Sequence, residues 1–370
     1  MTNEEKLEFI KANYKTTRAL ELLSEGKEEF LQEWISMVLN VIPQRLYRYR
    51  KCNKNNLNAL KNKKAWFSNP STWNDQIDVT VAYDIQKDIK YLDEHFDEYV
   101  LKFAFAFINK YIESFCEQKK FVTADQVKEV YYSSFKDDNV FNPGRMTAYL
   151  EPIVGWKPAR QITVKTQEAL AYTMSKEFKE KIINGFQKFL GFNNLRDKLL
   201  MYSLSETYNN NHQWAMYADS GAGFCIGYLI TPKNKKEKSL IPNLLPVYYG
   251  EKKTLSVSKM LDEALEFSVR QERLEDLINQ ESENLYVSLI TKSPEWSGEQ
   301  EWRFSITEEQ SNGKLVDFNF AEAVYLGENI SQYWKKRIIS IAKEQKLKVY
   351  QRKMDSLKSH WVYEELNIDL

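Results

Sequence analysis

The sequence predicts an α+β fold in which N-terminal helices and a helical insertion lobe accompany a mixed central β-sheet. Short apolar runs rich in β-branched and aromatic residues, which are typical of strands, occur in two separate parts of the chain. Long stretches with helical periodicity fill the rest. We therefore expect a helical arm over residues 1–42, a core domain over 43–83 and 197–370, and a helical lobe over 84–196.

The charge balance excludes several classes of partner. Lysine plus arginine number 52, as do aspartate plus glutamate, so there is no global basic signature for nucleic acid. Hydrophobic residues make up 43%, as in ordinary globular proteins. No apolar run approaches the roughly 18 residues of a membrane span. We expect a globular chain with no membrane partner.

The cysteines indicate a reducing compartment. Cys52, Cys116 and Cys225 are few, odd in number and far apart, so they form neither a disulfide framework nor a metal-ligand spacing. The stretch MTNEEKLEFIKANYK is too charged for a secretory signal. These observations predict a cytoplasmic protein without a metal site of this kind.

The first elements are predicted to be a helical arm, a strand and a short helix. Residues 5–40 place apolar side chains near helical period among many charged ones. Pro43 interrupts this pattern. Residues 46–50 (LYRYR) then alternate, which puts the tyrosines on one face of a strand and the arginines on the other. Residues 53–63 form the predicted short helix.

A polar turn follows the next predicted strand, which covers residues 65–68 and ends at Ser68. Residues 69–71 (Asn-Pro-Ser) have the side chains of a tight turn. The amide of Asn74, just beyond, fits two interpretations. It either stabilises the turn by bonding backbone groups or faces a ligand.

Residues 84–196 contain successive amphipathic stretches interrupted by proline and glycine, and they predict the helical lobe. The stretches cover residues 92–115, 124–135 and 166–189.

Two strands joined by a polar turn, a helical turn and a glycine bend form the predicted centre of the core. The first strand carries Ser203 and Ser205 near its end, and the second covers residues 224–230. Between them, Trp214 and Tyr217 lie at helical spacing. Hydroxyls and aromatic side chains at one end of such a unit are suited to the floor of a pocket. The same pattern also fits an ordinary core sheet with a polar turn.

The remaining chain predicts further strands and helices around this centre. Strands are expected over residues 244–249, 302–306, 323–327 and 347–350, helices over 256–290 and 331–346, and a solvated loop over 233–238.

Glu299 and Glu301 precede the late strand at residues 302–306, and its alternation points both carboxylates the same way. Two carboxylates on one face repel each other. They are tolerated only where water, a cation or a ligand offsets the repulsion.

Six motifs in this order resemble a bacterial family called domain of unknown function 2971. They are LYRYR, WFSNPSTWND, SLSE…W…YADSGAGFCIGY, LLPVYY, EQEWR and AVYLG. The resemblance covers residues 46–350, less the helical insertion. It implies a bacterial cytoplasmic protein, and some members are associated with phage defence or toxin-like roles.

The order of an early arginine, middle serines and a late glutamate is also similar to the pattern of ADP-ribosyltransferases, which use NAD. This resemblance implies NAD binding by Arg48 and by Ser203 or Ser205, with Ser68 as a rival for the serine role. It implies that Glu301 stabilises the transition state and that Glu299 activates an acceptor. Three further side chains complete the predicted NAD site, namely Asn74, Trp214 and Tyr217.

Two other functions stay open. In a non-catalytic sensor or interaction module of a bacterial defence system, these residues would be structural, with an unknown macromolecular target or partner protein. In a magnesium-dependent nuclease, Asp75, Asp78, Glu299 and Glu301 would surround the cation.

Overall fold

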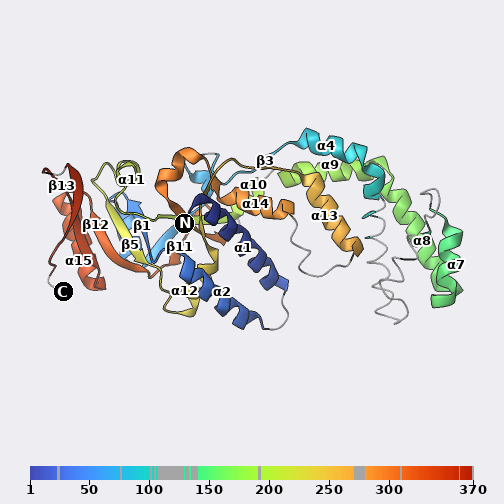
Figure 1. The fold of residues 1–370 in the computed structure, drawn as a ribbon, viewed down its shortest axis with the longest axis horizontal. Helices are drawn as coiled ribbons and strands as arrows, with labels where there is room; N and C mark the ends of the chain where they lie inside the picture. Colours follow the sequence, from blue (N-terminus) through green and yellow to red (C-terminus); the bar gives the residue numbers. More distant parts are fainter. Residues whose placement is uncertain are drawn as a thin grey trace. The chain divides into compact units, whose positions relative to one another are not determined.

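The computed structural model confirms an α+β protein, with 54% helix and 22% strand (Figure 1). It describes residues 1–22, 26–75, 77–100, 102–103, 106, 129, 133–134, 141–190, 193–270, 280–308, 311–357 and 359–368. Cys116, about half of the predicted stretch 92–115 and most of the predicted stretch 124–135 lie outside these residues. None of the described helices is long and apolar enough to cross a membrane.

The chain forms two compact units. Unit 1 contains residues 1–81, 193–253 and 285–370, and unit 2 contains residues 82–192 and 254–284. Unit 1 includes the N-terminal helices expected to form an arm, and unit 2 includes residues 254–284, which were expected in the core domain.

A mixed sheet is the centre of unit 1. Its strand order is β11-β2-β4-β1-β5-β12-β13-β14, and β10 and β6 pair beside β4. The β12–β13 pair is parallel, and the other pairs of this sheet are antiparallel. The strands are β1 (Arg45–Arg50), β2 (Lys64–Ser68), β4 (Leu199–Ser205), β5 (Phe224–Leu229), β6 (Leu244–Pro246), β10 (Glu301–Thr307), β11 (Gly313–Asp317), β12 (Ala321–Leu326), β13 (Lys348–Asp355) and β14 (His360–Glu365).

Strand β4 is shared between three neighbours. β10 pairs with it along its whole length, from Glu301 opposite Ser205 to Thr307 opposite Leu199. β1 pairs with it only at Ser205, and β2 pairs with it only at Met201. Because β10 takes one edge of β4, β1 and β2 share the other edge, one at each end. The sheet is therefore split beside the middle of β4.

Alternation along β4 separates the hydrophobic core from a polar face. Leu200, Tyr202 and Leu204 belong to the main core cluster, whereas Ser203 and Ser205 point to the opposite face.

Helices pack on this core through apolar stripes. Helix α2 (Lys27–Val41) contributes Trp34, Ile35 and Val38 to it, which explains why the predicted arm belongs to unit 1. The same cluster includes side chains of α3 (Lys54–Lys61) and α15 (Gln332–Gln345). Helix α1 (Asn3–Leu22) contributes Ile10 to a neighbouring cluster.

Unit 2 is built mainly from helices. Leu92, Phe178 and Phe186 pack with Val257 and Leu265 in its largest cluster. These contacts join residues 254–284 to the helical lobe. The helices are α4 (Ile85–Glu94), α7 (Pro143–Val154), α8 (Trp156–Thr173), α9 (Lys176–Leu190) and α13 (Val257–Arg270), with the short strands β3 (Ala82–Tyr83) and β8 (Thr254–Leu255).

Several predicted elements were wrong in kind or extent. Residues 235–240 form helix α12 rather than a loop. The Asn234 side chain caps this helix by accepting a hydrogen bond from the backbone N–H of Glu237. The strand expected over 244–249 is divided between β6 and β7 (Tyr248–Tyr249), which pairs with β9 (Thr291–Lys292). Within the described residues, the helix expected over 256–290 is confirmed by α13 and by α14 (Gln280–Ile290). β11 and β14 were not predicted.

Candidate functional site

One cavity of unit 1 collects most of the predicted site residues. It has a volume of about 300 Å³ and is lined by residues of β1, β4 and β10, of the loop after β2, and of helix α11 (Asn211–Tyr217). Seven residues proposed for the NAD site line it: Arg48, Asn74, Ser203, Ser205, Tyr217, Glu299 and Glu301. The fold therefore brings together side chains that are far apart in the sequence.

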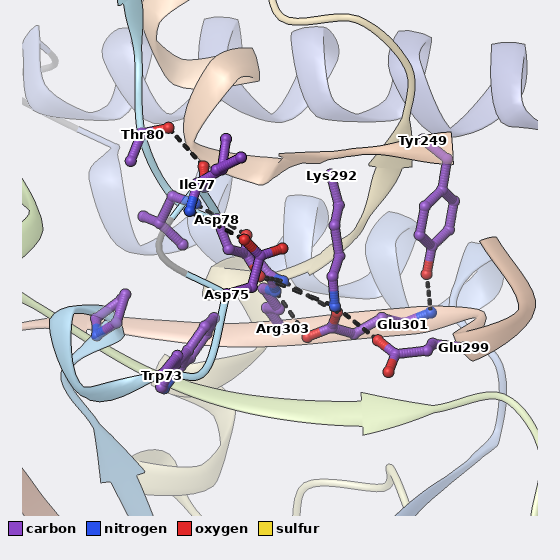
Figure 2. A network of polar contacts seen from close by, with 12 residues as sticks. Trp73, Asp75, Ile77, Asp78, Thr80, Tyr249, Lys292, Glu299, Glu301 and Arg303 are labelled. Atoms are coloured by element: carbon purple, nitrogen blue, oxygen red, sulfur yellow. Dashed lines mark hydrogen bonds and ion pairs between the residues drawn. The ribbon is translucent and has the colours of Figure 1, made fainter. Parts of the chain in front are cut away.

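A buried ion network lies at one wall of this cavity (Figure 2). Arg303 NH1 and NH2 donate to the two carboxylate oxygens of Asp78 at 2.9 and 2.6 Å. Arg303 also donates to both oxygens of Glu301, from Nε at 2.7 Å and from NH2 at 3.0 Å. Since Arg303 is fully buried, it holds both carboxylates without competition from water.

Lys292 links Glu299 to this network. Its Nζ donates to Glu299 Oε2 at 2.7 Å and to Glu301 Oε2 at 3.3 Å. Asp78 Oδ2 lies 3.9 Å from the same nitrogen. The other oxygen of Glu299 accepts a hydrogen bond from the Tyr217 hydroxyl at 2.8 Å. Three carboxylates therefore face two cations in the network, which leaves an excess of negative charge.

The backbone at Gln300 places the two glutamates. Glu299 ends a 3₁₀ helix (Pro294–Glu299), Gln300 has left-handed angles (φ 46°, ψ 53°), and Glu301 begins β10. Both carboxylates reach the cavity. The expectation that strand alternation aligns them was wrong, because Glu299 precedes the strand and the turn at Gln300 aligns them instead.

The pKa of Glu301 shows which influence dominates at this wall. Burial raises the pKa of the carboxyl, but the positive charges of Arg303 and Lys292 and the hydrogen bonds from Arg303 and Ser203 more than offset it. The pKa therefore lies well below its ordinary value, and Glu301 is an anion throughout the physiological range.

A partly buried lysine holds the loop that carries Asp78. Lys252 Nζ donates to the carbonyl oxygens of Ile77 at 2.7 Å and Thr80 at 2.8 Å. Burial lowers the pKa of Lys252 to about 8, and the charges of Asp78 and Asp75 oppose that effect. This lysine fixes the loop on both sides of Asp78, which in turn holds Arg303.

Arg48 is bound within the split of the sheet. Its NH1 donates to the Ser203 carbonyl at 2.6 Å, and its guanidinium lies 5.3 Å from the centre of the Tyr202 ring. Its Nε is buried and has no hydrogen-bond partner in the structure. Burial and the neighbouring charge of Arg50 lower the pKa of Arg48.

The two serines have different surroundings. Ser205 is buried, and its hydroxyl donates to the backbone carbonyl of Glu299 at 2.8 Å. Gln213 Nε2 donates to the same carbonyl at 2.9 Å. Ser205 therefore holds the 3₁₀ helix in place. The half-buried Ser203 side chain instead forms a hydrogen bond that lowers the pKa of Glu301.

Two predicted binding residues do not line the cavity. Trp214 is 1% exposed, packs against Tyr49, and donates from Nε1 to the Tyr208 carbonyl at 2.9 Å. Helical spacing predicted a shared face with Tyr217, but residues three apart diverge enough for one to be core and one to be accessible. The hydroxyl of Ser68 accepts a hydrogen bond from Trp73 Nε1 at 2.9 Å, so it supports a cavity residue rather than lining the cavity itself.

Sequence reasoning missed the aromatic and cationic partners of the acidic wall. Trp73 and Trp296 line the cavity. The Trp73 ring centre lies 5.0 Å from the Arg303 guanidinium, and that of Trp296 lies 4.6 Å from Lys292 Nζ. In the sequence, only the i, i+2 spacing of Glu301 and Arg303 indicated this network. Lys292 could not be linked to them because it belongs to a different sheet.

The acidic side chains named for the nuclease alternative do not form a cation site. Within the described ranges, no group of three or more His, Cys, Asp or Glu residues is arranged to hold a metal ion. Asp78 and Glu301 are instead both paired with Arg303.

Comparison with known proteins supports the family resemblance. The model of a family described as "Protein of unknown function (DUF2971)" matches residues 213–304, about a quarter of the chain. The chain resembles this family there, in a segment that contains Lys292, Glu299, Glu301 and Arg303. No curated protein and no solved structure matches the chain.

Proposed function

We propose that unit 1 is an ADP-ribosyltransferase-like enzyme that uses NAD as its substrate in the acidic cavity. The observation that carries this proposal is the Glu301 carboxylate, which ion pairs keep ionised at a cavity wall shared with Arg48 and Ser203. The cavity volume of about 300 Å³ is at the lower end for small-molecule sites, roughly 300–1,000 Å³. It suits the nicotinamide and its ribose, with the adenylate extending outward.

The fixed anion would act on a developing cation. When the bond between ribose C1 and nicotinamide breaks, its electron pair leaves with nicotinamide and positive charge develops on the ribose. Glu301 is held by Arg303 before the reaction and has no need to reorganise, so it stabilises the transition state more than the ground state. Tyr217, Trp73 and Trp296 supply aromatic surface for the leaving ring.

The acceptor completes the reaction by bonding to ribose C1, and its proton passes to Glu299. The family resemblance extends the proposal to a bacterial toxin or phage-defence effector that modifies an unidentified macromolecule. Both described cysteines, Cys52 and Cys225, are free thiols, which suits a reducing cytoplasm.

The test is NAD consumption by wild type and by Glu301→Gln, with thermal unfolding measured on both. The substitution removes the charge that faces the developing cation, and we expect turnover to fall about 100- to 1,000-fold, or about 3–4 kcal/mol. Glu206→Gln is the matched control. Glu206 accepts a hydrogen bond from Trp302 Nε1 and does not line the cavity. Equal rates in wild type and folded Glu301→Gln, or no NAD consumption by wild type with any bacterial extract as acceptor, would contradict the proposal.

One observation favours a second function, a non-catalytic sensor or interaction module. Each carboxylate oxygen of Glu299 and Glu301 already has a protein partner. If the network is only structural, Glu301→Gln lowers stability and wild type has no NAD-dependent activity for it to lose. Because the buried ion pair is broken under either function, the NAD-consumption measurement separates the two, and the unfolding measurement checks that the variant is folded.

A further inference from the structure

A second cavity of unit 1 differs from the first in charge. Its volume is about 500 Å³. Among the described residues that line it none is acidic, whereas Asp75, Asp78, Glu299 and Glu301 line the first cavity. Its polar lining consists of Arg50, Lys64, Asn53, Asn55, Asn56, Asn58 and Asn62, and its aromatic lining consists of Trp66, Tyr202 and Tyr228.

The sequence around this cavity is basic, although the whole chain is neutral. From residue 34 to residue 74 there is no aspartate or glutamate. The same stretch contains eight basic residues, Arg45, Arg48, Arg50, Lys51, Lys54, Lys61, Lys63 and Lys64. A cavity in this part of the chain favours an anionic ligand.

Arg50 supplies an available cation. Its guanidinium lies 5.3 Å from the centre of the Tyr202 ring. It is partly buried, and in the described part of the chain its side chain makes no hydrogen bond or ion pair. Arg303, by contrast, is fully occupied by Asp78 and Glu301. Arginine binds phosphate through paired hydrogen bonds, and Arg50 has all of its donors free for this purpose.

Helix α3 presents a stripe of amides to the same cavity. Asn55, Asn58 and Asn62 follow one another at helical spacing, and all three line the cavity. The opposite stripe, Leu57 and Leu60, is buried in the core. The side chains of Asn55 and Asn58 make no hydrogen bond within the described residues. An amide offers a donor and an acceptor together, which is the pattern needed to bind the edge of a base.

An aromatic surface is available beside these polar groups. Trp66 is 43% exposed, and its cross-strand neighbour Leu315 is 49% exposed. Both line the cavity. Exposed aromatic rings next to cations bind unpaired bases by stacking.

We propose that this cavity binds a nucleotide, with Arg50 paired to its phosphate, the asparagine stripe bonded to its base, and Trp66 available for stacking. The nucleotide is either free or part of a single strand of nucleic acid. This site is separate from the proposed transferase cavity and does not depend on its activity.

Binding to the full-length protein tests the proposal. The probes are AMP, followed by calorimetry, and a labelled oligoadenylate of about ten nucleotides, followed by fluorescence anisotropy. The test variants are Arg50→Gln and Asn58→Ala. Lys233→Gln is the matched control, because it removes one charge from an exposed lysine outside this cavity. Thermal unfolding is measured on every variant.

We expect Arg50→Gln to weaken binding about tenfold or more, because charge-assisted bonds to phosphate are strong. Lys233→Gln should change it less than about twofold, since an exposed charge outside the cavity contributes mainly through screened attraction. Tight AMP binding identifies a free nucleotide, and binding of the oligonucleotide alone identifies a strand. The proposal is overturned if neither probe binds at about 1 mM, a typical limit for weak affinity. It is also overturned if Arg50→Gln and Lys233→Gln weaken binding equally.

Glu301→Gln separates this site from the proposed transferase. It should bind both probes like wild type, whatever the outcome of the NAD assay. If it loses nucleotide binding while Arg50→Gln retains it, the nucleotide occupies the first cavity and the second site is refuted.

Discussion

The carboxylate of Glu301 is paired with Arg303 in the folded chain and free in the unfolded chain, so its ionisation links stability to pH. Its pKa is lower in the folded state. The stability from this pair is therefore fully present above the unfolded pKa of about 4.3 and is lost as pH falls toward the folded pKa.

Denaturant unfolding of wild type and Glu301→Gln between pH 3 and pH 8 measures this contribution. The difference in unfolding free energy should be constant from pH 6 to pH 8, at about 3 kcal/mol for a broken buried pair. It should shrink below about pH 4, where the unfolded carboxyl becomes protonated. A difference that grows with acidity would show that Glu301 is not held as an anion.

Gln300 is the residue whose backbone aligns the two glutamates. Its side chain is exposed and its φ is 46°, so its role lies in conformation. Gln300→Val should destabilise the protein by about 1–3 kcal/mol, because β-branched residues resist left-handed angles. Gln300→Gly should cost much less, since glycine adopts these angles readily. Equal unfolding midpoints for the two variants would contradict this role.

Single residues also show how far sequence reasoning extends. Tyrosines and arginines were correctly assigned to opposite faces of β1, because alternation is a local property. The assignment of Trp214 to the pocket was wrong, because the spacing of aromatic residues does not reveal which side of a helix is buried. Lys292 was missed as the partner of Glu299, and Trp296 as the partner of Lys292, because these contacts depend on the tertiary fold.

Among the helices, α4 and α13 are joined by one buried carboxylate. Asp88 accepts hydrogen bonds from Val257 N at 3.1 Å and Ser258 N at 3.2 Å, at the start of α13. The hydroxyls of Ser256 and Ser258 donate to it at 2.8 and 2.6 Å. An aspartate from one helix thus caps another, 169 residues later in the chain.

Asp88→Ala should therefore destabilise the protein by about 2–3 kcal/mol, through the lost cap and the buried donors left unpaired. Asp88→Asn, which keeps one acceptor oxygen, should cost less. Urea unfolding followed by helical circular dichroism is the measurement. A full-sized effect in Asp88→Asn would show that charge rather than hydrogen bonding holds α13.

The elements differ in how far the sequence predicts their place in the fold. Strands β4, β5 and β10 were correctly placed from their alternation and residue types. The membership of α13 in unit 2 was not predicted, because its charged helical pattern resembles that of other helices. Its partner is set by Asp88 and by apolar contacts with Leu92 and Phe178.

At the scale of the whole chain, a net charge of zero conceals a division of charge. The first cavity is predominantly acidic, and the second has no acidic residue among its described lining. Global composition correctly gave no overall basic signature. It could not show a local one, because Arg50 and the asparagine stripe of α3 become one surface only when β1 and α3 fold together.

The alternation of side chains along β4 also constrains how this protein could change in evolution. Since successive β4 residues alternate between the main core cluster and the opposite, polar face, a one-residue insertion or deletion would exchange Tyr202 with Ser203. It would bury hydroxyls in the core and place aromatic rings at the acidic cavity. A change of two residues would preserve both faces, so related chains should vary in length at β4 only in even steps.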